Sequence, residues 1–337
     1  MGVRPAQDRA AACILGPVRP PTLVAHADWG WSPPKRWLAR ACLEAGRYVA
    51  RAPEPVGAPP TLLGDLVAAA PGGGPVLLGF DFPIGLPAAY AERVGITRFL
   101  DVLPGFGEAA WPEFYRVADR PEDIALARPF YPDRPGLSGA RRRVHLAQGL
   151  GVTLSALWRA CDRKQPYRRA AAPIFWTLGG QQVGKAAISG WRDVLGPALR
   201  SGDVDVAIWP FAGRLGELLR PGRVVIVECY PAEIYAQLGL VFRRRGERKW
   251  GKRIQADRRA NAARLFAWAR SAGVALAPSL RKAIASGFGA GADGEDRFDA
   301  VVGLCGMLET ALGRRPPGEP DDEVVRAVEG WILGLRV

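Results

Sequence analysis

Residues 22–31, with the sequence TLVAHADWGW, give the clearest structural signal in this chain. The apolar, β-prone run Leu23-Val24-Ala25 is typical of a buried strand, and it leads to Asp28 directly before a turn rich in Trp, Gly, Ser and Pro. The tip of a central strand holds a carboxylate rigidly and opens towards solvent, so α/β proteins place catalytic groups and metal ligands there. Asp before Gly, Ser and Pro is also ordinary turn chemistry, and on this stretch alone a turn cap is the simpler interpretation.

The rest of the chain alternates apolar strand patterns with helix patterns, which predicts an α/β fold. Strands are expected at residues 35–44, 47–52, 75–80, 204–209 and 224–229, with a hairpin turn at 45–46. Helices are expected at residues 62–70, 231–238, 254–271, 280–286, 300–312 and 321–333. The fourth strand ends in Asp81, and Glu228 lies at the tip of the last one. The final helix is amphipathic and is expected to pack across the sheet.

Residues 82–200 are less regular and rich in proline and aromatic residues. Short helices are expected at 87–94 and 153–159 and a longer one at 182–199, which predicts a large, mostly helical insertion after the fourth strand. We expect this insertion to build one wall of a cleft. No linker-like stretch or internal repeat separates it, so residues 21–337 are predicted to form a single domain after an N-terminal arm of residues 1–20.

Composition narrows the class of protein. The chain has five cysteines without a CxxC pair and only two histidines, so a structural zinc site is not expected, and reduced cysteines fit a cytoplasmic protein. No apolar run approaches the ~20 residues that cross a bilayer, and the apolar run near the start is too short for a secretory signal. Lys and Arg number 46 against 33 Asp and Glu, a net charge of +13 that favours nucleic acid as partner. An Arg- and Ala-rich composition by itself also produces such an excess.

Five acidic residues lie at a strand tip or in the first turns of a helix after an apolar core element: Asp28, Asp81, Glu228, Asp296 and Asp299. Asp296 and Asp299 are three residues apart and share a helix face, where the helix dipole alone would favour them. Converging carboxylates repel one another unless a cation lies among them, and hard oxygen ligands suit Mg²⁺ or Mn²⁺. Two such ions about 3.5–4 Å apart activate a water and stabilise the leaving oxygen of a phosphodiester. The joint pattern therefore predicts a metal site.

Four stretches carry a family resemblance: HADWGWSPPKRW, GFDFPIGLP, VIVECYPAEIY and EDRFDAVVGL. They are similar to the DUF429 group, a family of predicted ribonuclease H-like nucleases, and the order of strands and helices resembles that of the ribonuclease H-like fold. The resemblance implies an RNase H-like mixed β-sheet flanked by helices, with the five acids as active-site residues. The chain differs in its long middle insertion, and Asp296 stands where related nucleases sometimes have a histidine.

Other residues are candidates for contacts with substrate phosphates. Residues 179–185 match GxxxxGK, but Ala186 replaces the Ser or Thr of a P-loop, so a nucleotide P-loop is not expected. Gln181, Gln182 and Lys185 at this helix start remain candidates, with a plain helix start as the alternative. The densest basic run supplies Arg243, Arg244, Arg245, Lys249 and Lys252, and its alternative is a solvated charged loop.

The sequence thus predicts a metal-dependent phosphodiester hydrolase, a nuclease. Asp28 would bridge two Mg²⁺ or Mn²⁺ ions, Asp81 and Asp299 would complete the pair, and Glu228 or Asp296 would be a further ligand or position the water. Two alternatives stay open: the same fold acting on a small nucleotide or cofactor, and a nucleic-acid- or nucleotide-binding protein without turnover. DNA or RNA as substrate, and the oligomeric state, are left undetermined.

Overall fold

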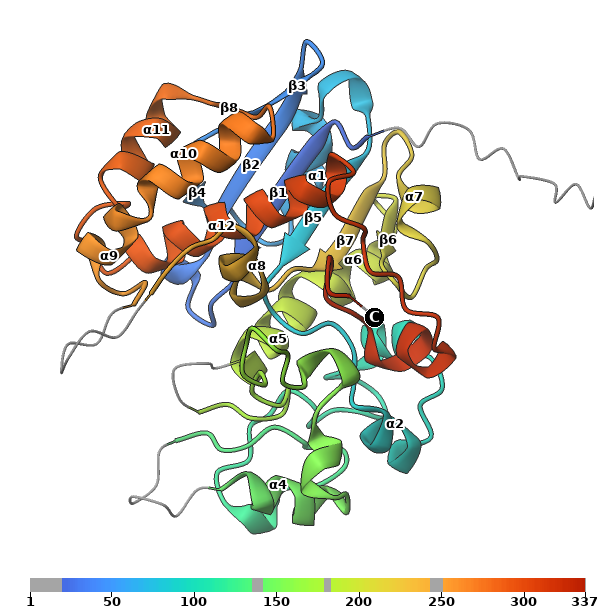
Figure 1. Cartoon of the computed structure of the whole chain (residues 1–337). Coiled ribbons are helices and arrows are strands. Elements are labelled where there is room, and N and C mark those ends of the chain that lie inside the picture. The colour runs from blue at the N-terminus through green and yellow to red at the C-terminus, as the bar shows by residue number, and fades with distance from the viewer. Residues whose placement is uncertain (1–19, 135–141, 179–182, 243–250, 337) are drawn as a thin grey trace, which may run out of the picture.

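A computed structural model describes residues 20–134, 142–178, 183–242 and 251–336 of the chain (Figure 1). The strands are β1 (Leu23–Asp28), β2 (Trp37–Glu44), β3 (Arg47–Ala50), β4 (Glu54–Pro55), β5 (Val76–Phe80), β6 (Val206–Ile208), β7 (Val224–Glu228) and β8 (Ala275–Leu276). The α-helices are α1 (Leu62–Ala69), α2 (Ala88–Val94), α3 (Phe99–Val102), α4 (Arg143–Leu150), α5 (Val183–Gly190), α6 (Gly196–Ser201), α7 (Leu215–Leu218), α8 (Pro231–Gln237), α9 (Gln255–Ala260), α10 (Ala262–Ser271), α11 (Pro278–Ala285) and α12 (Gly294–Ala311).

The strands form one mixed sheet with the order β6-β7-β5-β1-β2-β3-β8, and β4 pairs with β2. β1 lies near the centre, antiparallel to β2 and parallel to β5. β7 and β6 continue the parallel side of the sheet beyond β5. The predicted hairpin turn joins β2 to β3, and both Ala45 and Gly46 have the positive φ that a two-residue hairpin turn needs.

Helices cover both faces of the sheet (Figure 1). On one face α1 and apolar residues from the 82–195 region pack on Leu23, Ala25 and Ala27 of β1. On the other face α8, α10, α11 and α12 pack on the residues that alternate with these, such as Val24. A mixed α/β architecture with flanking helices, as predicted, is therefore confirmed.

The helix α12 lies against β1 and β2 on the second face and brings its first turns to the site described below. Gly303 makes this close approach possible, because a Cβ atom there would lie 2.2 Å from atoms of the buried His26 ring. The His26 Nε2 atom lies 3.1 Å from the Cys229 carbonyl oxygen, and burial lowers the pKa of His26 to about 4. His26 is therefore a neutral core residue that supports the strand leading to Asp28.

Some predicted elements differ from the observed ones. The helix expected at 254–271 is two helices, α9 and α10, because the Asn261 side chain pairs with both backbone groups of Val241 at the break. The region 153–159 contains a 3₁₀ turn, Leu154–Leu157, and the region 182–199 is helical from Val183 to Ser201 with a π-helical segment.

The helix predicted at 321–333 is wrong over residues 330–333. Helical structure there ends at Glu329, and Gly330 follows with a φ of 71°. A Cβ atom at position 330 would lie 2.1 Å from the Ile84 carbonyl oxygen, so only glycine fits there. The chain then extends beside β7, where Leu333 N–H donates to the Glu228 carbonyl oxygen at 2.8 Å. Within the described ranges, no helix combines the length and apolarity that crossing a bilayer requires. The predicted N-terminal arm lies outside these ranges except for Pro20.

Candidate carboxylate site

Two carboxylates lie side by side at neighbouring strand tips. The parallel pairing of β1 and β5 places Ala27 opposite Phe80, and the residues that follow are Asp28 and Asp81. The Trp29 N–H donates to Asp81 Oδ1 at 2.8 Å, and the negative charge of Asp81 raises the pKa of Asp28. Both point to the face of the sheet that α12 covers, because side chains alternate along a strand. Asp28 is 9% exposed.

The helix α12 adds a third buried acid. Asp299 is 3% exposed, and its two oxygens accept hydrogen bonds from the Tyr235 hydroxyl and the Lys252 ammonium. The Lys252 Nζ atom also lies 3.2 Å from Glu295 Oε1 in the first turn of α12. Acids in this turn are stabilised by the positive end of the helix dipole.

The pKa values of the acids reflect burial and mutual repulsion. Burial, and then the charges of Asp81 and Asp299, hold the pKa of Asp28 well above its ordinary value. Burial raises the pKa of Asp81 to about 7, although the Trp29 N–H opposes the rise, and it raises the pKa of the half-buried Asp296 to about 6. Negative charge is therefore costly here, and a bound cation would relieve the cost.

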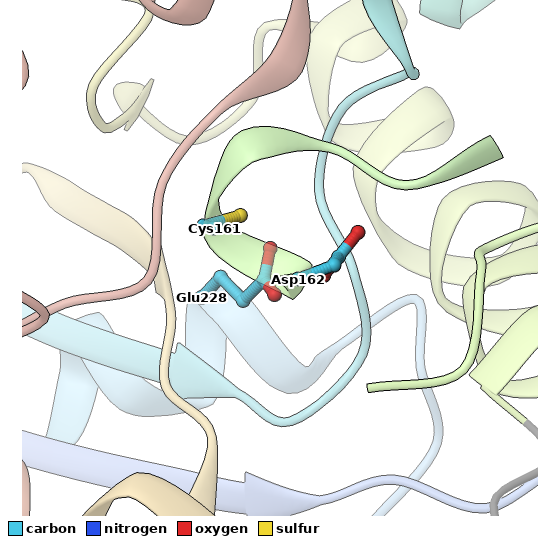
Figure 2. A group of neighbouring side chains, drawn as sticks. All are labelled: Cys161, Asp162 and Glu228. Atoms are coloured by element: carbon cyan, nitrogen blue, oxygen red, sulfur yellow. The ribbon is translucent and has the colours of Figure 1, made fainter. Parts of the chain in front are cut away.

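Asp28 and Asp81 fit a hard divalent cation, because both present carboxylate oxygens at one place where burial and repulsion disfavour their charged forms. Asp28, Asp81 and Asp299 do not, however, bring one oxygen each within 4.8 Å of the others. In the described part of the chain, the acidic or thiol group that does so is Cys161, Asp162 and Glu228 (Figure 2).

The Glu228 cluster is a buried ion pair on the other side of the sheet. Arg159 is fully buried, and its guanidinium binds Glu228 at 2.7 and 2.8 Å and Asp162 at 2.9 Å through two atoms. The Ile84 N–H donates to Glu228 Oε2 at 2.8 Å, and burial raises the pKa of the Cys161 thiol well above its ordinary value. All four carboxylate oxygens already accept hydrogen bonds and the thiol keeps its proton, so this group does not suit a metal ion.

Glu228 therefore does not join Asp28 and Asp81, contrary to the sequence-based expectation. In the register of β5 and β7, Glu228 pairs with Phe80, the residue before Asp81. Because side chains alternate along a strand, the Glu228 side chain points to the face of the sheet opposite that of Asp81. Glu228 attaches residues 84 and 159–162 to the end of β7. Of the predicted acids, the structure brings together Asp28, Asp81, Asp299 and, more peripherally, Asp296, which interacts electrostatically with Asp28.

The predicted substrate-binding residues are only partly described. Gln181, Gln182, Arg243, Arg244, Arg245 and Lys249 lie outside the described residues. Lys185 is in α5 and donates to the Asp133 carbonyl oxygen at 3.3 Å. One helical turn later, Ser189 accepts a hydrogen bond from the Trp29 indole at 3.0 Å, so α5 lies close to the site. Lys252 lies inside the acid cluster itself.

Four contributors were not expected from the sequence. Tyr235 closes the motif VIVECYPAEIY and reaches Asp299 from α8, and Glu295 precedes Asp296. Trp31 is 43% exposed in the turn after Asp28, with the Arg192 guanidinium 5.4 Å from its ring. The motif VIVECYPAEIY continues beyond Glu228 to Tyr235, and this was the feature of the sequence that could have indicated Tyr235. No feature of the sequence predicts the contact between Trp31 and Arg192.

No family model matches this chain, and comparison with curated proteins and with solved structures finds no similar protein. The function is therefore inferred from the geometry of the site and from the chemistry of its side chains.

Proposed function

We propose that the protein is a metal-dependent phosphodiester hydrolase that acts on nucleic acid. The observation that carries the proposal is the pair of carboxylates at adjacent parallel strand tips, the buried Asp28 and the partly buried Asp81, beside Asp299 and Lys252. Paired carboxylates shielded from solvent suit Mg²⁺ or Mn²⁺, which when bound supplies Lewis acidity towards a phosphoryl group.

The residues around the pair have separate roles in this proposal. Asp28 and Asp81 hold the ion. Tyr235 and Lys252 fix the Asp299 carboxylate, which places the lysine charge beside the two metal-binding acids. Asp296, with a pKa of about 6, accepts a proton from the attacking water near neutral pH. The water oxygen bonds to phosphorus, the bond to the leaving oxygen breaks, and that oxygen takes a proton from solvent.

We also propose that the fold is RNase H-like, with residues 82–200 as an insertion. The antiparallel β1-β2-β3 meander, the crossover through α1 and the parallel pairing of β5 on the other side of β1 support this assignment. The 82–200 region leaves the sheet directly after Asp81 and extends one core by packing its aromatic residues around Phe82 and Trp191.

Nucleic acid is the substrate class that the rim of the site favours. Trp31 offers an exposed aromatic face three residues after Asp28, and Arg192 lies over it. Lys35 in the same turn is exposed and lowers the pKa of Asp296 through its charge. An aromatic face among cations next to a phosphoryl-transfer site suits a base that stacks while its phosphate reaches the acids.

The test combines metal binding with hydrolysis. Mn²⁺ is titrated calorimetrically into the wild type, Asp28→Asn and Asp205→Asn; Asp205 is an exposed acid that pairs with Arg220 and Arg223. Single- and double-stranded DNA and RNA are then incubated with Mg²⁺, Mn²⁺ or chelator. We expect binding and metal-dependent cleavage by the wild type and Asp205→Asn, and loss of both in Asp28→Asn. A wild type that neither binds Mn²⁺ nor cleaves any of the four substrates would overturn the proposal.

A further inference from the structure

Lys252 lies where a cation among the carboxylates is needed. Its Nζ atom contacts Asp299 Oδ2 and lies 3.2 Å from Glu295 Oε1. The neighbouring Arg253 binds the other oxygen of Glu295 at 3.3 Å, so the segment that carries Lys252 is attached to α12 by two cations. The ammonium group is thus held in the cluster by contacts with α12, although 37% of the Lys252 side chain is exposed.

The charge of Lys252 acts on every acid of the cluster. It opposes the rise that burial causes in the pKa values of Asp28, Asp81, Asp296 and Asp299. In return Asp299 and Glu295 raise the pKa of Lys252 well above its ordinary value, against the effect of burial. The lysine is therefore protonated at neutral pH and is a resident positive charge.

Asp299 is correspondingly unavailable as a ligand of a second metal ion. Its Oδ1 accepts from Tyr235 and its Oδ2 from Lys252. Asp28, Asp81 and Asp299 do not place three oxygens within 4.8 Å of one another, whereas Asp28 ends β1 and Asp81 directly follows β5, two strands that pair in register. A second divalent ion would need the Asp299 oxygen that the ammonium group binds.

We propose that the Lys252 ammonium replaces the second divalent cation, so that the site holds one metal ion on Asp28 and Asp81 and the lysine faces the substrate phosphate. The inference rests on the proposed function and changes the two-ion arrangement expected from the sequence. A lysine suits this place because it brings a compact point charge with three donors, two of which Asp299 and Glu295 engage.

The test is the stoichiometry of Mn²⁺ binding, measured by calorimetry without substrate. The variants are Lys252→Met, which keeps the length of the side chain without its charge, and Lys282→Met, which removes an exposed lysine in α11. We expect one ion per chain for the wild type and for Lys282→Met. Lys252→Met should bind two ions, the first about tenfold more tightly, because the repulsion between the ammonium group and the ion is gone.

Each outcome decides a different question. Two ions bound by the wild type would overturn the role of Lys252 and leave the proposed function standing. One ion bound by Lys252→Met with wild-type affinity would overturn it as well. No Mn²⁺ binding by the wild type, without cleavage of any nucleic acid, would instead remove the proposed function. Two ions on the wild type would overturn the role even if Lys252→Met does not fold, and Lys252→Gln would then serve as the second uncharged variant.

Discussion

At the scale of single residues, the acids of the site are held at a cost to stability. Asp28 is buried against Asp81, and both carry pKa values raised by burial and repulsion. Without metal at pH 8, Asp28→Asn should therefore stabilise the fold, because the amide donates to Asp81 and removes one charge. Each kcal/mol should raise the Tm by about 1.5 °C in a chain of 337 residues. Calorimetry in chelator tests this; Asp205→Asn is the control, and a lower Tm for Asp28→Asn would contradict the expectation.

Glu228 should have the opposite properties. Its carboxylate forms a bidentate pair with the fully buried Arg159, so Glu228→Gln should lower the free energy of unfolding by about 3 kcal/mol. Mn²⁺ affinity should stay at the wild-type value, because Glu228 faces the other side of the sheet. Urea unfolding and Mn²⁺ titration measure the two effects. Lost Mn²⁺ binding at unchanged stability would return Glu228 to the metal site.

The contrast between these acids shows which parts of the site the sequence predicts and which it does not. The strand tips of Asp28 and Asp81 were predictable from apolar runs followed by a turn. The side on which Glu228 lies depends on the register of β7 against β5, and a shift of one residue reverses it. Arg159, the partner that identifies Glu228 as structural, is 69 residues away in the chain, and no local pattern predicts that contact.

At the scale of elements, the position of α12 on β1 controls the site. Gly303→Ala would place a Cβ atom 2.2 Å from ring atoms of His26, and that ring is held by Cys229. Overpacking of this kind costs about 1–3 kcal/mol or more of the free energy of unfolding, which urea unfolding measures. Gly64→Ala in α1 is the control: nothing lies within 4 Å, and it should stabilise by up to about 1 kcal/mol. Equal stability of the two variants would contradict this account.

Most elements were predictable in kind, and their ends were less so. The strands β1, β2, β3, β5 and β7 match apolar runs bounded by turns, since local pattern decides a buried strand. The break at Asn261 and the end of helical structure before Gly330 depend on tertiary partners, Val241 and Ile84 respectively. An amphipathic pattern over residues 321–333 cannot reveal that the end of this segment, at Ile332, pairs with β7.

At the scale of the whole molecule, the net charge of +13 becomes informative once cations are located near the acids. Lys252, Lys35 and Arg192 surround a site that is itself acidic. Under the proposed function, such an arrangement would attract a polyanion to the rim while the acids bind a divalent ion. Excess positive charge alone also follows from composition, so the salt dependence of binding must decide between a long polyanion and a small ligand.

Trp31 provides the sharpest test of the substrate class. In chelator, Trp31→Ala should weaken binding of a single-stranded oligonucleotide about tenfold through lost stacking, with the slope of log K against log salt unchanged. Arg192→Ala should make that slope shallower by about 0.7, because one phosphate contact is lost. Fluorescence anisotropy from low to high salt measures both, with Leu312→Ala, an exposed apolar residue at the far end of α12, as control. A binding constant that changes neither with salt nor in Trp31→Ala would exclude this surface as the binding site. It would favour a small nucleotide or cofactor as the ligand.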